Sequence, residues 1–339
     1  MTFLVSAVIF GVLVLVHEGG HFLAARRAGV RVDEFGIGFG PPLLRWGRRA
    51  TRYSLRLIPL GGFVRMAGSE PGEENEPEGF MRQPVGRRAG IIFAGPAMNL
   101  VLALLLFAFI FAVLGIEQPI PRLASVLPGH PAAQAGLQPG DLVVSVQGYP
   151  VRGWEEVVAQ VQASLGKPLT LGIERAGQRL EVEIVPEPSP QDPRYGFVGV
   201  SPEITRKREA PGQALFSAGK ETYRVTILWM RGLMMAIMGR VEARVMGPVG
   251  IGALIGQAAR IGLPTLLYLA ALLSANLGLI NLLPIPALDG SRLLFLGIEA
   301  VRGRPIDPAK ESLIHLVGFA ILMLFFLFIT YMDLLHLGA

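Results

Sequence analysis

The sequence predicts an α-helical integral membrane protein with four transmembrane helices. Apolar residues make up 51% of the 339 residues, and four segments reach the length of about 20 residues that a helix needs to cross a bilayer. These segments are residues 2–25, 90–116, 261–288 and 313–332. The chain has no cysteine, which excludes disulfides, thiolate nucleophiles and thiolate metal sites.

The first segment, residues 2–25, is expected to remain in the protein as a membrane span. A cleaved signal peptide is the alternative, but the segment lacks a basic n-region and a small-residue cleavage site. Arg26 and Arg27 follow it in the manner of a stop-transfer flank.

Basic residues predict the orientation of the spans, because short loops rich in Lys and Arg stay in the cytoplasm. The loop between the first two spans is rich in arginine, and the loop after the third span carries Arg292, Arg302, Arg304 and Lys310. Both loops are therefore expected to be cytoplasmic, with both termini and residues 117–260 on the outer side. No basic stretch is interleaved with aromatic residues, so nucleic acid is not an expected partner.

The first span ends in the sequence HEGGH, residues 17–21. Residues i and i+4 share one face of a helix, so His17 and His21 can bind one metal ion, with Glu18 beside them to take a proton from water. In a soluble protein this pattern alone is a weak signal. Within a membrane span, however, ionisable residues are costly and indicate a functional site.

Asp289 is the predicted third ligand, because a catalytic zinc ion usually has three protein ligands and one open position. The first and third spans cross the membrane in the same direction, and both end at the cytoplasmic side. HEGGH and Asp289 are therefore expected at the same depth. Taken alone, Asp289 followed by Gly290 would fit a turn or a helix cap equally well, but the matching depth favours the ligand.

The segment NLLPIPALDG, residues 281–290, cannot form a regular helix because Pro284 and Pro286 interrupt it. Irregular backbone at this depth has to be buried in protein or line a wet cavity. Asn276 and Asn281 are candidates for holding a substrate backbone or a developing oxyanion. The alternative for both is hydrogen bonding between membrane helices, and the cost of polar groups in lipid favours the substrate role.

HEGGH and NLLPIPALDG together resemble the site-2 protease family of intramembrane zinc metalloproteases, and within it the bacterial regulator of sigma-E type. The same resemblance extends over nearly the whole chain through GIGFGPPL (36–43), PLGGFVRMAG (59–68), FAGPAMNL (93–100) and GPVGI (247–251). It implies one Zn²⁺ held by His17, His21 and Asp289, with Glu18 as the catalytic base. It also implies a substrate-contacting region near the zinc that contains Asn276, Asn281, Pro284 and Pro286.

Residues 31–67 show the alternating pattern of short strands, and Gly and Pro residues within them mark turns. By resemblance they form a β-hairpin that re-enters the membrane beside the active site. An exposed strand edge there could pair with an unwound substrate segment. Gly36 and Gly38 would allow close approach of the substrate backbone; the alternative is that these glycines only make turns.

The outer segment is expected to form one compact domain and a connector. AGLQPGDLVVSVQG, residues 135–148, resembles a permuted PDZ domain, whose role would be peptide binding by strand addition, size filtering or packing. Residues 210–240 are expected to form a helix in the membrane interface rather than a fifth span, because Lys220, Glu221, Arg224 and Arg231 interrupt the apolar sequence. The expected division is a membrane core in two parts, 1–116 and 261–339, a PDZ domain at 117–188 and a connector at 189–260.

The predicted function is zinc-assisted hydrolysis of a peptide bond inside the bilayer, with Glu18 as the base. The resemblance implies a substrate that is a trimmed single-span protein, such as an anti-sigma factor or a remnant signal peptide, in the bacterial inner membrane. Two other classes fit less well. A catalytically silent PDZ scaffold does not need Glu18, and a metal transporter would be expected to show an internal repeat, which the sequence does not show convincingly.

Overall fold

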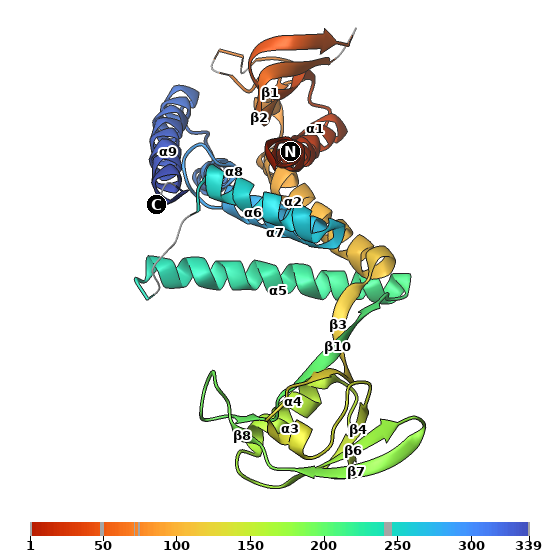
Figure 1. The fold of residues 1–339 in the computed structure, drawn as a ribbon. Helices are drawn as coiled ribbons and strands as arrows, with labels where there is room; N and C mark the ends of the chain where they lie inside the picture. The colour runs from red at the N-terminus through yellow and green to blue at the C-terminus, as the bar shows by residue number, and fades with distance from the viewer. Residues whose placement is uncertain (1, 48–50, 71, 74, 241–245, 338–339) are drawn as a thin grey trace. The chain divides into compact units, whose positions relative to one another are not determined.

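The computed structural model describes residues 2–47, 51–70, 72–73, 75–240 and 246–337. The chain forms two compact units (Figure 1). The helical unit contains Met1–Leu114 and Glu209–Ala339, and the sheet unit contains Gly115–Arg208. Each unit has a hydrophobic core of its own.

Within the described part of the helical unit, four helices are long and apolar enough to span a membrane, as the sequence predicts. At most 28% of any spanning window is buried inside the protein, which is expected for helices whose outer faces contact lipid. The four helices are α1 (Thr2–Arg27), α2 (Val85–Phe109, continued by a π-helical turn at Ile110–Leu114), α7 (Leu263–Asn281) and α9 (Pro308–Leu337).

The third span ends earlier than the predicted range of 261–288. α7 stops at Asn281, and an irregular turn leads to the start of α8 (Asp289–Arg302). Pro284 and Pro286 lie in this turn and cannot donate the backbone hydrogen bonds that would continue the helix. Asp289 therefore stands at the beginning of a separate helix.

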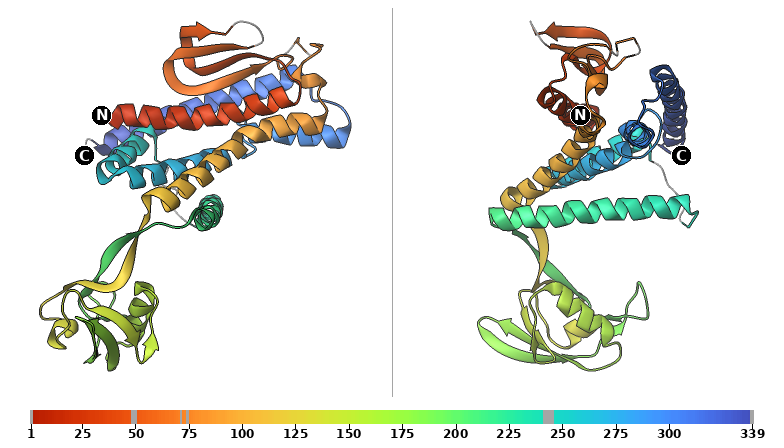
Figure 2. Two further views of the ribbon diagram at one scale, coloured as in Figure 1. Left: turned by 90° about the vertical axis from the view of Figure 1, so that its right-hand side faces the viewer. Right: turned by 180° about the vertical axis from the view of Figure 1, so that it is seen from behind.

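Glycines allow α1, α2 and α7, which lie side by side, to pack closely (Figure 2). A β-carbon at Gly20 of α1 would overlap the backbone of Ala94 in α2. On the other face of α2, a β-carbon at Gly278 of α7 would come within 2.8 Å of the carbonyl oxygen of Pro96. The backbone of α2 thus lies directly against both neighbouring helices.

α5 (Pro211–Ile237) is one continuous helix in the segment for which the sequence predicts an interfacial helix. It is held to α7 by Tyr268, whose hydroxyl donates a hydrogen bond to Glu221 and accepts one from Arg224. α6 (Pro248–Ile261) lies between α5 and α7 in the sequence and contacts α1 and α7.

The hairpin segment consists of two long antiparallel strands, β1 (Val32–Trp46) and β2 (Arg52–Met66). Both strands are irregular, so that residues 34–37 pair with residues 62–65 on one side and with residues 52–55 on the other. The end of β2 is therefore an outer edge of this small sheet, and β2 contacts α1. The strands are present where the sequence predicts them, whereas entry of the hairpin into a membrane stays a prediction.

The sheet unit is built on a six-stranded antiparallel sheet with the path β10–β3–β4–β6–β7 and β5 beside β4. These strands are β3 (Ile116–Val126), β4 (Leu142–Val146), β5 (Tyr149–Pro150), β6 (Leu169–Arg175), β7 (Gln178–Ile184) and β10 (Val200–Lys207). The other elements of the sheet unit are α3 (Pro131–Gln134), α4 (Trp154–Ala163), β8 (Glu187–Pro188) and β9 (Gly196–Phe197). The short helix η1 (Phe80–Arg82) belongs to the helical unit. Because β10 pairs with β3, the unit includes a strand that lies outside the predicted PDZ range of 117–188.

An ion pair between a buried carboxylate and a half-buried guanidinium joins Asp141, the residue before β4, to Arg175 of β6. The side chain of Asp141 is 1% exposed and accepts hydrogen bonds from Nε and Nη2 of Arg175, both at 2.7 Å, and from the backbone N–H of Gln138 at 2.8 Å. Burial opposes ionisation of Asp141, but these hydrogen bonds outweigh it and hold the pKa of its carboxyl below the ordinary value.

Replacing Arg175 by Met is expected to destabilise the sheet unit by about 3 kcal/mol, because it leaves a buried carboxylate unpaired. Because the pKa of Asp141 is lower in the folded protein than in the unfolded chain, its ionised carboxylate stabilises the fold at pH values above the unfolded-state pKa. This stabilisation is lost as the pH falls through the folded-state pKa. Hydrogen exchange of the full chain at neutral and acid pH measures both effects. Arg179→Met, at an exposed position on β7, is the control, and equal exchange in the two variants would contradict the prediction.

Candidate metal centre

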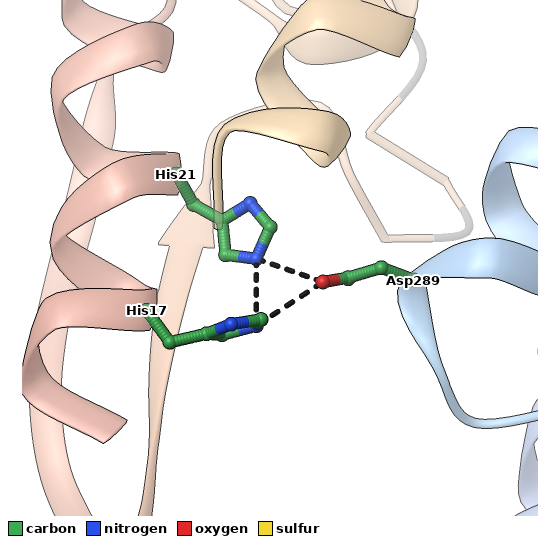
Figure 3. A group of neighbouring side chains, drawn as sticks. All are labelled: His17, His21 and Asp289. Atoms are coloured by element: carbon green, nitrogen blue, oxygen red, sulfur yellow. Dashed lines mark hydrogen bonds and ion pairs between the residues drawn. The ribbon is translucent and has the colours of Figure 1, made fainter. Parts of the chain in front are cut away.

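Two histidines of α1 point their rings to the same side of the helix (Figure 3). His17 and His21 are one helical turn apart, and both are buried, with 8% and 6% of their surface exposed. Their Nε2 atoms lie 3.2 Å apart. The helical spacing of HEGGH thus brings two potential ligand atoms together, as the sequence predicts.

Asp289 completes the group from the first turn of α8 (Figure 3). Its Oδ2 atom lies 3.1 Å from Nε2 of His17 and 3.2 Å from Nε2 of His21. The next residue, Gly290, allows this placement, because a β-carbon there would overlap the carbonyl oxygens of Leu282 and Leu283 at the end of α7. The structure therefore brings together the three residues that the sequence pattern proposes as ligands.

The partner of His21 on α2 determines which nitrogen of its ring carries a proton. Nδ1 of His21 lies 2.9 Å from the carbonyl oxygen of Ile91, which can only accept a hydrogen bond. Neutral His21 therefore carries its proton on Nδ1 and directs the lone pair of Nε2 toward Asp289. A β-carbon at Gly95 of α2 would overlap the ring of His21, so this glycine makes room for the histidine.

The geometry of the three donors fits a tetrahedral zinc site. Ligand atoms bound at about 2.0–2.1 Å in a tetrahedron lie about 3.3 Å from one another, and the three donor–donor distances are 3.1–3.2 Å. Oδ2 of Asp289 is buried and accepts no hydrogen bond from the described residues. Two imidazole nitrogens and one carboxylate oxygen at these distances can share one cation, and this set of donors suits Zn²⁺.

Glu18 lies next to this group and against the outer edge of the hairpin. A β-carbon at Gly62 of β2 would lie 3.0 Å from Cγ of Glu18 and 3.1 Å from Cγ1 of Val14. The bare backbone at Gly62 is what allows the strand edge to approach the glutamate so closely. The sequence stretch around Gly62 matches the family resemblance, but its position beside Glu18 could not be predicted from the pattern.

A model of peptidase family M50 matches residues 5–325. The chain belongs to peptidase family M50. This is the site-2 protease family of metallopeptidases that HEGGH and NLLPIPALDG resemble, and both segments lie within the matched range.

Curated M50 relatives align with the chain over nearly its whole length. It is 33% identical to the zinc metalloprotease RasP of Oceanobacillus iheyensis, covering 99% of this chain and all of the relative. It is 31% identical to the regulator of sigma-W protease RasP of Bacillus subtilis, covering 99% of each. Among solved structures, the PDZ domain of the SdrC-like protein Lin2157 from Listeria innocua covers 25% of this chain at 17% identity, with a TM-score of 0.23.

The asparagines and prolines predicted to contact substrate lie along α7 and the turn after it. Oδ1 of Asn276 is buried and has no hydrogen-bond partner among the described residues. Asn281, in contrast, uses its amide nitrogen to donate to the carbonyl oxygen of Leu277 at 3.0 Å. Pro284 is exposed, and Pro286 packs against α9, where a β-carbon at Gly318 would overlap it.

The two hairpin glycines do not lie at an open strand edge. Gly36 is paired with Phe63 on one side and Ser54 on the other, and the ring of Phe63 covers it. Gly38 has a φ of 86°, in the region that favours glycine, so it makes a bend in β1. The edge that remains available beside Glu18 belongs to β2.

His315 of α9 supports the turn that precedes Asp289. Its Nδ1 accepts a hydrogen bond of 3.0 Å from the backbone N–H of Ala287, which has an unusual φ of 76°. His315 is the one residue in the fourth predicted span whose side chain can carry a charge near neutral pH. Such residues within a membrane span indicate a functional role. The target of His315, however, depends on the fold of the turn and was not predictable.

Proposed function

We propose that this chain is an intramembrane zinc metalloprotease that hydrolyses a peptide bond within the transmembrane segment of a single-span protein. The observation that supports this most directly is the meeting of Nε2 of His17, Nε2 of His21 and Oδ2 of Asp289 beside Glu18 at the end of a spanning helix. An M50 relative is a regulator of sigma-W protease by name, which supports an anti-sigma factor, trimmed beforehand, as the substrate; a remnant signal peptide has the same single-span chemistry.

In this proposal His17, His21 and Asp289 hold one zinc ion, which when bound polarises the scissile carbonyl and lowers the pKa of a water molecule. Glu18 takes the proton of the attacking water and delivers it to the leaving nitrogen. Oδ1 of Asn276, which has no hydrogen-bond partner among the described residues, is proposed to accept a backbone N–H of the substrate. Asn281, Pro284 and Pro286 form the neighbouring wall of the substrate path.

The edge of β2 supplies a way to present the peptide bond. The backbone of a helical substrate is internally hydrogen-bonded, so the segment has to unwind before water can attack its carbonyl group. Residues 62–65 pair on one side only, and Gly62 brings this edge against Glu18. We propose that the substrate adds as a strand at this edge, with Gly36 and Gly38 shaping the hairpin behind it.

The proposed setting is a bacterial inner membrane, with the metal centre near the cytoplasmic side. The arginine-rich loop after α1 and the basic residues after Asp289 support a cytoplasmic position for both. Both termini and the sheet unit, proposed as a PDZ domain, would then lie outside. Membrane lipid surrounds the spanning helices, and the hairpin re-enters the membrane beside α1.

Cleavage by the purified full chain in lipid bilayers tests the proposal. A single-span protein without its outer domain is expected to be cut inside its span, and mass spectrometry of the products locates the cut. Removal of metal with a chelator is expected to stop the reaction, and Zn²⁺ alone to restore it. Cleavage that continues after the metal has been removed, or that falls outside the span, would contradict the proposal.

A further inference from the structure

A buried amide from α2 lies behind the ring of His17. Asn99 is 0% exposed, and its Nδ2 is 3.3 Å from Nδ1 of His17. Its oxygen, Oδ1, is also buried and has no hydrogen-bond partner among the described residues. This amide is therefore placed on the side of the histidine ring that faces away from Asp289.

We propose that Asn99 is a positioning residue that holds His17 in its metal-binding tautomer by accepting a hydrogen bond from Nδ1–H. The inference rests on the proposed zinc site. A histidine that binds metal through Nε2 needs the lone pair on that atom, so its proton has to sit on Nδ1. An Nδ1–H donor requires an acceptor, and the amide of Asn99, whose nitrogen lies 3.3 Å from Nδ1, can supply its oxygen when it turns by 180°.

A half-turn of the side-chain amide brings its oxygen to the ring of His17. It exchanges the positions of Oδ1 and Nδ2, so that the oxygen receives the proton of Nδ1. The buried oxygen, which otherwise has no partner among the described residues, then accepts a hydrogen bond, while the amide nitrogen moves into the position that the oxygen leaves. Loading of the site with metal, which fixes the proton on Nδ1, selects this orientation.

The histidines thus have matching supports from the same helix. His21 donates from Nδ1 to the backbone carbonyl of Ile91, and in the proposed orientation of Asn99 His17 donates from Nδ1 to its amide oxygen. Such outer partners fix the ring orientation of metal-binding histidines. α2 is itself held in place by α7, because Ser274 donates from Oγ to the backbone carbonyl of Asn99 at 2.7 Å.

The test compares zinc affinity, measured by chelator competition on the purified full chain, between two replacements of Asn99. Asn99→Leu keeps the approximate volume and removes the acceptor, and it is expected to weaken zinc binding about 10- to 100-fold. Asn99→Asp keeps an acceptor oxygen and is expected to bind zinc at least as tightly as the wild type. Equal affinities in the wild type and the folded Asn99→Leu variant would overturn the proposal, as would a loss in Asn99→Asp as large as that in Asn99→Leu.

Ser274→Ala is the matched control, because it removes a buried hydrogen bond at the same helix contact without touching the ring of His17. It is expected to lower the thermal midpoint and leave zinc affinity unchanged; a loss of affinity equal to that of Asn99→Leu would show a general packing effect and overturn the proposal. If Asn99→Leu does not fold, Asn99→Ala replaces it with the same criteria. A wild type whose zinc binding does not depend on His17 would instead refute the zinc site itself.

Discussion

Replacing Glu18 by Gln is expected to lower the rate of peptide cleavage by about 100- to 10,000-fold, the range that a general base supplies. The amide has nearly the same shape as the carboxylate but cannot take a proton from water. Glu18 is not one of the three groups that meet at the metal centre, so zinc content is expected to stay at the wild-type level. Product formation from a single-span substrate, together with metal analysis of the same sample, measures both.

A control for this variant has to change a carboxylate without touching the reaction. Glu221→Gln fits, because Glu221 lies on α5 and pairs with Arg224 and Tyr268. It is expected to affect stability and to leave the chemical step intact. Full cleavage by a zinc-loaded Glu18→Gln sample would remove Glu18 from the mechanism.

Replacing Asp289 by Ala is expected to abolish both tight zinc binding and cleavage. The carboxylate is the only negative charge in the group of His17, His21 and Asp289, so its removal takes away a ligand and the charge that balances the cation. Removing a residue that only hydrogen-bonds to a metal ligand weakens metal binding by at most roughly 100-fold. Removing the ligand Asp289 itself is expected to weaken zinc binding by more than this. Competition with a zinc chelator measures it.

Asp289→Asn separates the ligand role from a structural one. The amide keeps the shape and one oxygen donor, so an intermediate zinc affinity is expected between the wild type and Asp289→Ala. Asp307→Ala, at an exposed helix start where the carboxylate accepts from Ala309 N–H, should not change zinc binding. Zinc affinity in Asp289→Ala equal to that of the wild type would exclude Asp289 as a ligand.

The grouping of His17, His21 and Asp289 was predictable from the sequence because the positions of its parts are set by simple periodicities. The i, i+4 spacing of His17 and His21 depends only on the helix, and hydropathy alone identifies four spans. The first and third predicted spans cross the membrane in the same direction, which predicts a common depth for His21 and Asp289. Their meeting at 3.2 Å agrees with that expectation.

The supports of the site were not predictable, because they arise where distant segments pack. Asn99 lies in a stretch that matches the family resemblance, but only the crossing of α1 and α2 brings it to His17. The sequence predicts Gly36 as a substrate contact, yet both hairpin strands fold back, enclose Gly36 and leave Gly62 at the edge. A pattern of residue types does not fix how a two-stranded ribbon bends.

X-ray absorption at the zinc edge of the purified full chain tests most directly whether the two histidines of α1 and Asp289 share one ion. The expected spectrum shows two imidazole nitrogens and oxygen ligands at about 2.0–2.1 Å, with one imidazole lost in His17→Ala and one oxygen ligand changed in Asp289→Asn. A spectrum with fewer than two imidazoles in the wild type, or one that neither substitution alters, would contradict a shared zinc ion at this site.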